Sequence, residues 1–387
     1  MTEGPTGLLA TSDGEIFEGR SIGVDGVVTG EAVFNTSMTG YQEILTDPSY
    51  AGQVVVMTSP HIGNYGVNEF DQQSASPALS GFVVRSMSRR ESNWRSEGTL
   101  SGYLANNQVV ALSEIDTRRL TRHLRTQGAM PVAMGAGMTE GELKEAAAAA
   151  PRMEGQDLVS LVTTTEPYRL EAEGERLGNV HAIDLGLKKD ILRNLTRRGF
   201  DVEVVPADTP ATAILEAGPD GVFVSNGPGD PEPLLATTET LKGLIGKVPV
   251  FGICLGHQVM GLAAGASTFK LPFGHHGGNH PVRRYSDGGI EITAQNHGFA
   301  VDLWPMTGDK PPARDPMVGP DVLPESVDTE FGELRPTHQN LNDGTLEGMV
   351  LVDASAYSVQ YHPESAPGPS DARALFDDFV TLIGEGV

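Results

Sequence analysis

The second half of the chain alternates short apolar strands with helices, and this alternation limits the fold more than any other feature of the sequence. Strands are predicted over residues 179–185, 201–205, 221–225 and 248–253, and a helix is predicted over residues 188–198. Repeated units of this kind specify a parallel sheet covered by helices on both faces, which is an α/β fold. Functional side chains collect at the carboxyl ends of the strands in such sheets. The residues that directly follow these strands are therefore the first candidates for a site.

The first part of the chain has the pattern of a β-rich domain instead. Segments 26–34 and 53–59 are typical of β-strands, and Gly, Asn, Asp and Pro turn signals separate them. One helix is predicted over residues 115–125. A second helix begins at Thr139, whose hydroxyl can cap the helix. The side chain of Glu142, three residues later, can in turn accept a hydrogen bond from the Thr139 amide.

A chain of 387 residues is long enough for two domains, because single hydrophobic cores stop growing at about 250 to 300 residues. We predict an N-terminal mixed β-rich domain over residues 1–150, a polar and acidic linker over residues 151–177, and a mostly parallel α/β domain over residues 178–387. Within the second domain, residues 304–330 are rich in Pro and Asp and lack periodicity, which predicts a surface insertion.

The composition is strongly acidic, with 51 Asp and Glu residues against 27 Lys and Arg residues and a formal charge of −24. This charge argues against nucleic acid as a partner. It fits adaptation to a salt-rich cytoplasm, and it fits an ordinary acidic protein equally well. The sequence shows neither a signal peptide nor an apolar stretch that could cross a bilayer, so we expect a cytoplasmic protein without membrane contact.

Cys254 is the only cysteine, which excludes an intrachain disulfide and a Cys-x-x-Cys metal site. It lies in Gly252-Ile253-Cys254-Leu255-Gly256, between an apolar strand and a small-residue helix, and this is the cysteine form of a nucleophile elbow. Both glycines are needed because a side chain there would collide with neighbouring backbone. The helix N-terminus favours the thiolate. Taken alone, the motif also fits a buried structural cysteine.

Of the ten histidines, His362 is the best placed to act as a base. It ends a predicted strand over residues 357–361, because Pro363 cannot continue the ladder, and Glu364 can orient its imidazole. Taken alone, a His before a Pro is also typical of a turn. His275, His276 and His280 do not have the spacing of helical metal ligands, and no cysteine or nearby carboxylate completes a set, so we predict no metal site.

The glycine-rich turn over residues 225–231 follows another apolar strand and matches no phosphate-binding fingerprint. Its backbone N–H groups, together with the Leu255 amide, could form an oxyanion hole. The alternative is a tight loop without function.

Three motifs, in this order along the chain, resemble the class I glutamine amidotransferase family: the turn Gly227-Pro228-Gly229-Asp230-Pro231, the Cys254 elbow, and His362-Pro363-Glu364. Four further segments resemble the carbamoyl-phosphate synthase small-subunit family: residues 40–50, 59–66, 273–281 and 294–301. The resemblance covers nearly the whole chain. The departure is the stretch 304–330, which is longer than expected of the family.

The resemblance implies a triad in which Cys254 is the nucleophile, His362 the base and Glu364 the residue that orients it. It implies that the Gly227 and Leu255 amides hold the oxyanion, and that glutamine is bound by Ser49, Gly229, Gln258, Asn296, Gly298 and Phe299. It also implies a large-subunit partner that uses ATP, Mg and bicarbonate to make carbamoyl phosphate for arginine and pyrimidine biosynthesis. This chain would supply the ammonia and hold no cofactor itself, in agreement with the lack of an ATP-binding motif.

Three other functions remain open. The chain could serve another glutaminase of the class, such as that of anthranilate synthesis, although residues 1–150 argue against it. It could be a thiol peptidase or esterase that uses the same elbow. A scaffold without activity is the third alternative, and it would leave the positions of Cys254, His362 and Glu364 unexplained.

The charge balance predicts how stability depends on salt. Excess carboxylates repel one another in dilute buffer, and dissolved ions screen that repulsion. The melting temperature should therefore rise from dilute buffer to molar potassium chloride, as measured by calorimetry at constant pH. A melting temperature that stays flat or falls over this range would contradict the hypothesis.

Overall fold

The computed structural model describes residues 4–309 and 323–385, and the chain divides into two compact units. Unit 1 comprises Met1–Gln156 and Pro272–Gly277, and unit 2 comprises Asp157–Leu271 and Gly278–Val387. The middle of the predicted insertion, residues 310–322, lies outside the described residues.

The boundary between the units falls at Gln156, not near Leu177 as the sequence suggests. Much of the expected linker is bound into unit 2, because the Thr164 amide donates to Asp184 (2.8 Å) and β8 (Tyr168–Leu170) pairs with β10 (Phe200–Pro206). β8 is only three residues long and two of them are exposed, so it lacks the apolar run that predicted the other strands.

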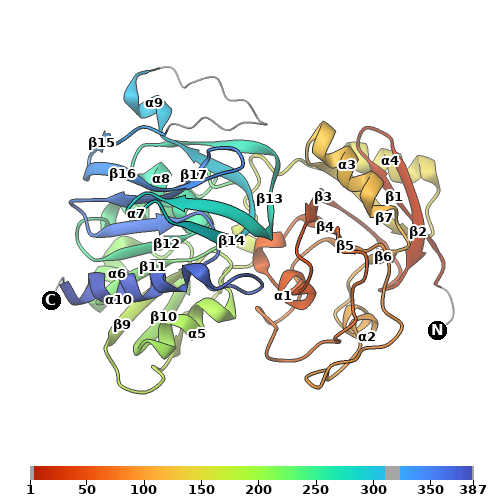
Figure 1. Cartoon of the computed structure of the whole chain (residues 1–387), viewed down its shortest axis with the longest axis horizontal. Helices are drawn as coiled ribbons and strands as arrows, with labels where there is room; N and C mark the ends of the chain where they lie inside the picture. Colours follow the sequence, from red (N-terminus) through yellow and green to blue (C-terminus); the bar gives the residue numbers. More distant parts are fainter. Residues whose placement is uncertain (1–3, 310–322, 386–387) are drawn as a thin grey trace. The chain divides into compact units, whose positions relative to one another are not determined.

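Unit 1 is built on a closed barrel with the strand order β1-β2-β6-β5-β4-β3-β7 (Figure 1). The strands are β1 (Thr6–Thr11), β2 (Ile16–Ser21), β3 (Val27–Asn35), β4 (Gln53–Met57), β5 (Gly81–Val83), β6 (Ala111–Ser113) and β7 (Met130–Ala136). The run β3-β4-β5-β6 pairs in parallel and the other pairs are antiparallel, so the prediction of a mixed β-rich domain is confirmed.

The helices of unit 1 are α1 (Tyr41–Leu45), η1 (Pro48–Tyr50), α2 (Leu100–Asn106), α3 (Thr117–Gln127) and α4 (Glu140–Ala149). Helix α3 buries Leu120 and Leu124. At the start of α4, the Thr139 amide donates to Glu142 (2.8 Å) and the Glu142 amide donates to the Thr139 hydroxyl (3.4 Å). The predicted capping box is therefore confirmed.

Unit 2 is built on an 11-stranded sheet within the described residues, with the order β14-β13-β16-β17-β18-β12-β11-β9-β10-β8 and β15 paired to β16. Its other strands are β9 (Gly178–Asp184), β11 (Gly221–Val224), β12 (Val250–Ile253), β13 (Ser267–Arg284), β14 (Ile290–Asp302), β15 (Val327–Thr329), β16 (Gly332–Asn340), β17 (Leu346–Leu351) and β18 (Ala356–Val359). The central run β10-β9-β11-β12-β18 is parallel, as the alternating pattern predicts.

Helices cover both faces of this parallel run (Figure 1). The helices are η2 (Val159–Leu161), α5 (Lys189–Arg197), α6 (Ala211–Ala217), α7 (Leu235–Leu244), α8 (Leu255–Ala263), α9 (Trp304–Thr307), η3 (Asp371–Ala374) and α10 (Leu375–Glu385). One apolar core packs α5 and α10 against Val180 and Ala182 of β9, and the other packs α6, α7 and α8 against Ile183. Successive residues of one strand thus supply opposite cores, which explains the apolar runs within these strands.

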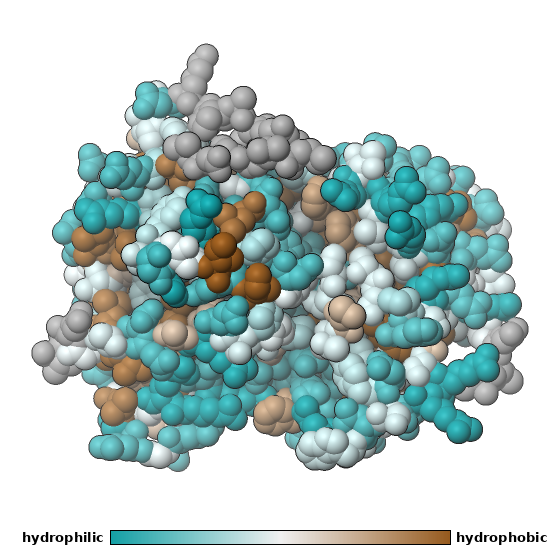
Figure 2. All heavy atoms as spheres, in the orientation of Figure 1, coloured by the Kyte–Doolittle hydropathy of each residue, from teal (hydrophilic) through white to brown (hydrophobic). Residues whose placement is uncertain are grey.

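Among the described residues, no helix is both long and apolar enough to cross a membrane. On the face drawn in Figure 2, hydrophilic residues predominate and hydrophobic residues form small separate groups.

Candidate active site

Cys254 joins β12 to α8 through a strained turn. It is the N-cap of α8 and has a φ of 54° and a ψ of −103°, which residues other than glycine rarely adopt. A Cβ at Gly256 would lie 2.3 Å from the Val224 carbonyl oxygen, and one at Gly252 would lie 3.0 Å from the Gly256 backbone. The turn therefore has the geometry that the elbow motif predicts, with a steric reason for both glycines.

His362 reaches the same edge of the sheet from the neighbouring strand. β18 runs parallel to β12 with Val359 opposite Ile253, and the Cys254 amide donates to the Val359 carbonyl (2.9 Å). The His362 amide donates to the Ala294 carbonyl of β14 (2.9 Å). Adjacent parallel strands thus deliver the thiol and the imidazole together.

His362 lies between a carboxylate and the thiol, and both act on its proton affinity. Its Nδ1 is 2.8 Å from Glu364 Oε1, while Nε2 has no nitrogen or oxygen partner among the described residues. Burial lowers the pKa of His362, but the negative charges of Glu364 and Cys254 raise it, and the resulting pKa is well above the usual value of 6.5. An imidazolium beside the sulfur is the arrangement that activates a cysteine nucleophile.

A buried lysine, Lys188, completes this set of charges and was not predicted as a site residue. Its Nζ is 2.7 Å from Glu364 Oε1, the oxygen that also meets His362. Lys188 is 1% exposed and Glu364 is fully buried. Burial raises the pKa of Glu364, but Lys188 and His362 lower it, and the lowering is larger. Glu364 is therefore held as a carboxylate.

The position of Lys188 in the sequence pointed to the site, although the local residue pattern did not. It follows β9, so it stands beyond the carboxyl end of a parallel strand, where functional side chains collect. Residue patterns assign it only to the start of a helix, and it is the N-cap of α5. The Lys188 amide lies 3.4 Å from the Asn226 side-chain oxygen, which joins this loop to the glycine turn.

Gly227, one of the two predicted oxyanion donors, lies close to the side chain of Leu255, the other. A Cβ at Gly227 would be 2.7 Å from the Leu255 side chain and 2.1 Å from the Leu185 carbonyl oxygen, so only glycine fits there. The Leu255 amide belongs to the first turn of α8, where the helix itself offers no acceptor. The Asn226 side chain donates to the Gly186 carbonyl (2.8 Å) and fixes the turn.

Polar groups of β14 and of the segment that follows β18 lie near the sulfur. The thiol lies 3.6 Å from the Asn296 carbonyl oxygen, and the Gln360 amide nitrogen lies 3.7 Å from the sulfur. Gln258 donates to the Phe299 carbonyl (2.8 Å) and to the Gln360 side chain (3.1 Å). Gln360 was not predicted, although it stands two residues before His362.

The remaining predicted glutamine-binding residues are placed less directly. Gly298 lies in β14 between Asn296 and Phe299. Gly229 has a φ of 84°, and a Cβ there would lie 3.3 Å from Leu158. Ser49 belongs to unit 1, where its amide donates to Asp47 (2.9 Å), and its part in the site stays a prediction. The expectation that His275, His276 and His280 bind no metal also stays a prediction.

A second histidine near the elbow, His257, is not suited to act as the base. Its Nδ1 is 2.9 Å from the Ser358 hydroxyl, and burial, with nearby His338, lowers its pKa to about 3. His257 is therefore neutral at ordinary pH, and the assignment of the base to His362 is favoured.

Comparison with known proteins decides the family. Residues 9–134 match the family model of the carbamoyl-phosphate synthase small chain, CPSase domain, and residues 181–382 match that of glutamine amidotransferase class-I. Carbamoyl phosphate synthase small chains from Syntrophotalea carbinolica and Akkermansia muciniphila are 49% and 47% identical to this chain, each with 97% of both chains covered. This chain belongs to the carbamoyl-phosphate synthase small-chain family. The Halomonas eurihalina member is 45% identical, over 97% of this chain and 98% of its own.

The role of Lys188 in this family member can be tested through pH. Replacing Lys188 with Met removes a cation that lowers the pKa of Glu364, so Glu364 should become protonated at higher pH. The acid limb of the kcat/KM profile for glutamine should then move to higher pH, because His362 needs the ionised carboxylate. Lys189→Met, one residue further on, is the matched control and should leave the profile unchanged. An unshifted acid limb in Lys188→Met would show that the lysine has only a structural role.

Proposed function

We propose that the chain hydrolyses glutamine at Cys254 and supplies the ammonia to the large subunit of carbamoyl-phosphate synthase. The observation that carries the proposal is the Cys254 sulfur on a strained elbow, next to His362, whose pKa is raised by Glu364 and the sulfur itself. Family membership supports the same reaction.

The chemistry follows from the positions of these groups. The Cys254 sulfur attacks the side-chain amide carbon of glutamine, and the carbonyl oxygen takes the negative charge beside the Leu255 and Gly227 amides. His362 gives its proton to the amide nitrogen, ammonia leaves, and a γ-glutamyl thioester remains. His362 then accepts a proton from water, which attacks the thioester. Glutamate leaves, and the thiolate and imidazolium are restored.

Recognition of glutamine would fall to residues around the sulfur. Asn296 has its carbonyl oxygen 3.6 Å from the Cys254 sulfur. The proposed set also contains Gln258, Gly298, Phe299, Ser49 and Gly229. The hydrogen bonds of Gln258 to Phe299 and Gln360 tie α8 to β14 and to the segment that follows β18 before substrate arrives. Because these residues are already held in place, less conformational entropy is lost when glutamine binds.

The ammonia must reach its acceptor before it is protonated, which calls for a partner bound to this chain. Under this proposal the large subunit uses ATP, Mg and bicarbonate, and this chain, working in the cytoplasm, needs no cofactor for the glutamine half-reaction. The carbamoyl phosphate would serve arginine and pyrimidine biosynthesis.

Substitution of the nucleophile separates the two half-reactions. Cys254→Ser should reduce glutamine hydrolysis by about a thousandfold or more, because a serine hydroxyl is far less acidic than a thiol. The complex with the large subunit should still make carbamoyl phosphate from added ammonia. The measurement is glutamate release and carbamoyl phosphate formation by the same preparation. Substantial glutaminase activity in the purified variant would exclude Cys254 as the nucleophile.

A further inference from the structure

Gln360 lies beside the Cys254 sulfur and has no role in the reaction steps proposed for the chain. It directly follows β18 and is fully buried. Its backbone amide donates to the Glu347 carbonyl of β17 (2.9 Å), which fixes the backbone from which the side chain extends. Its side-chain nitrogen lies 3.7 Å from the sulfur, a distance at which an N–H group can donate to this large atom. A buried amide in this position calls for a physical explanation.

Neighbouring hydrogen bonds determine which end of the Gln360 side chain faces the sulfur. The Phe299 carbonyl can only accept, so Gln258 must turn its side-chain nitrogen toward that oxygen (2.8 Å). The same nitrogen of Gln258 lies 3.1 Å from the side-chain oxygen of Gln360 and donates to it. The nitrogen end of Gln360 is therefore the end that faces Cys254. A purely structural link between these segments would need only the bond between Gln258 and Gln360.

The sulfur also meets a group that favours its protonated form. The Asn296 carbonyl oxygen lies 3.6 Å from the sulfur and can accept a hydrogen bond from the thiol. Once the proton has moved to His362, this oxygen can only repel the negative sulfur. A donor on the sulfur offsets that repulsion, and hydrogen bonds to ionised groups are stronger than those to neutral groups. The Gln360 amide therefore stabilises the thiolate more than the thiol.

We propose that the side-chain amide of Gln360 donates a hydrogen bond to the Cys254 sulfur and stabilises the thiolate. The part that this bond plays in the reaction rests on the proposed function. The donor favours the thiolate that attacks glutamine, and it favours the thiolate again when the sulfur leaves the thioester. Because the Phe299 carbonyl orients Gln360 through Gln258, the donor is in place before substrate binds.

The test measures how fast iodoacetamide alkylates Cys254 at each pH, because the thiolate is the form that reacts. The chain has no other cysteine, so mass spectrometry of one peptide gives this rate without any glutamine turnover. Gln360→Met keeps an unbranched side chain and removes the donor. The pH at half-maximal alkylation rate, here the midpoint, should rise by about one unit or more, as expected when a charged group loses a hydrogen bond.

A second variant, Gln360→Glu, separates hydrogen-bond donation from shape. Glutamate keeps the size of the side chain and an oxygen that Gln258 can bind, but its carboxylate cannot donate to the sulfur. A structural role predicts an unshifted midpoint in Gln360→Glu, whereas the proposal predicts a rise in this variant as well. Ultraviolet absorbance of the thiolate measures the same midpoint without a reagent. If Gln360→Met does not fold, Gln360→Glu still decides between the two roles.

The other titratable groups around the sulfur are the same in every variant. His362 exchanges the proton with the sulfur in the proposed reaction, and Glu364 lies behind it, bonded to Lys188. Two further histidines, His257 and His297, lie on the neighbouring elements α8 and β14. A shift of the midpoint can therefore be assigned to the substitution itself.

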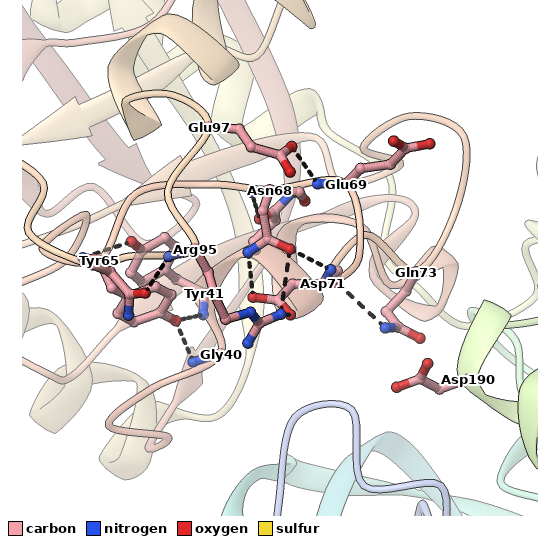
Figure 3. Close-up of polar contacts among 12 residues, drawn as sticks. Gly40, Tyr41, Tyr65, Asn68, Glu69, Asp71, Gln73, Arg95, Glu97 and Asp190 are labelled. Carbon is pink, nitrogen blue, oxygen red and sulfur yellow. Dashed lines mark hydrogen bonds and ion pairs between the residues drawn. The ribbon is translucent and has the colours of Figure 1, made fainter.

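The matched control is Gln73→Met in unit 1. Gln73 is also buried, and its side-chain amide donates to the Asp71 carbonyl (3.4 Å), as Figure 3 shows. This variant should keep the midpoint of the unmodified chain. An unshifted midpoint in either folded Gln360 variant, or an equal shift in Gln73→Met, would overturn the proposal. If the midpoint shifts as expected but the unmodified chain does not hydrolyse glutamine, the Gln360 donor stands and the proposed function fails.

Discussion

The site depends on a buried series of alternating charges that runs from Lys188 through Glu364 and His362 to Cys254. Removing charges from water is costly, and the cost is offset only when each charge meets an opposite one at hydrogen-bond distance. Here Glu364 Oε1 meets both Lys188 Nζ (2.7 Å) and His362 Nδ1 (2.8 Å). The imidazolium, in turn, is balanced by the sulfur. Glu364 and the sulfur both raise the pKa of His362, so the imidazolium is stabilised from both sides.

The sheet makes this series possible by bringing distant segments together. Lys188 follows β9, Cys254 follows β12, and His362 and Glu364 follow β18, and all three strands belong to the parallel run. The strained backbone of Cys254 is held by the Gly256 amide, which donates to the Ser225 carbonyl (3.0 Å), and by the absence of side chains at Gly252 and Gly256. Strain of this kind persists only where surrounding packing imposes it. Packing, strand order and site chemistry are therefore coupled.

Much of this arrangement could be predicted from the sequence. Apolar runs that end in glycine or a reactive residue predicted the parallel strands, and the spacing of two glycines around Cys254 predicted the elbow. The capping box at Thr139 could also be predicted, because its two residues lie only three positions apart in the chain. Lys188 and Gln360 were missed because their importance comes from neighbours 176 and 106 positions away in the chain. The stretch that contains β8 was assigned to the linker because two of the three residues of this strand are exposed, and its pairing with β10 joins residues far apart in the chain.

The central claim is that glutamine hydrolysis passes through a covalent bond to Cys254, and mass spectrometry of the acid-quenched chain during turnover tests it most directly. Because Cys254 is the only cysteine, any thioester must lie on one peptide. The account predicts a γ-glutamyl adduct on that peptide while glutamine is being consumed, and its disappearance when glutamine is exhausted. Glutamine turnover with the Cys254 peptide unmodified at every quench time, or with the adduct on another residue, would contradict it.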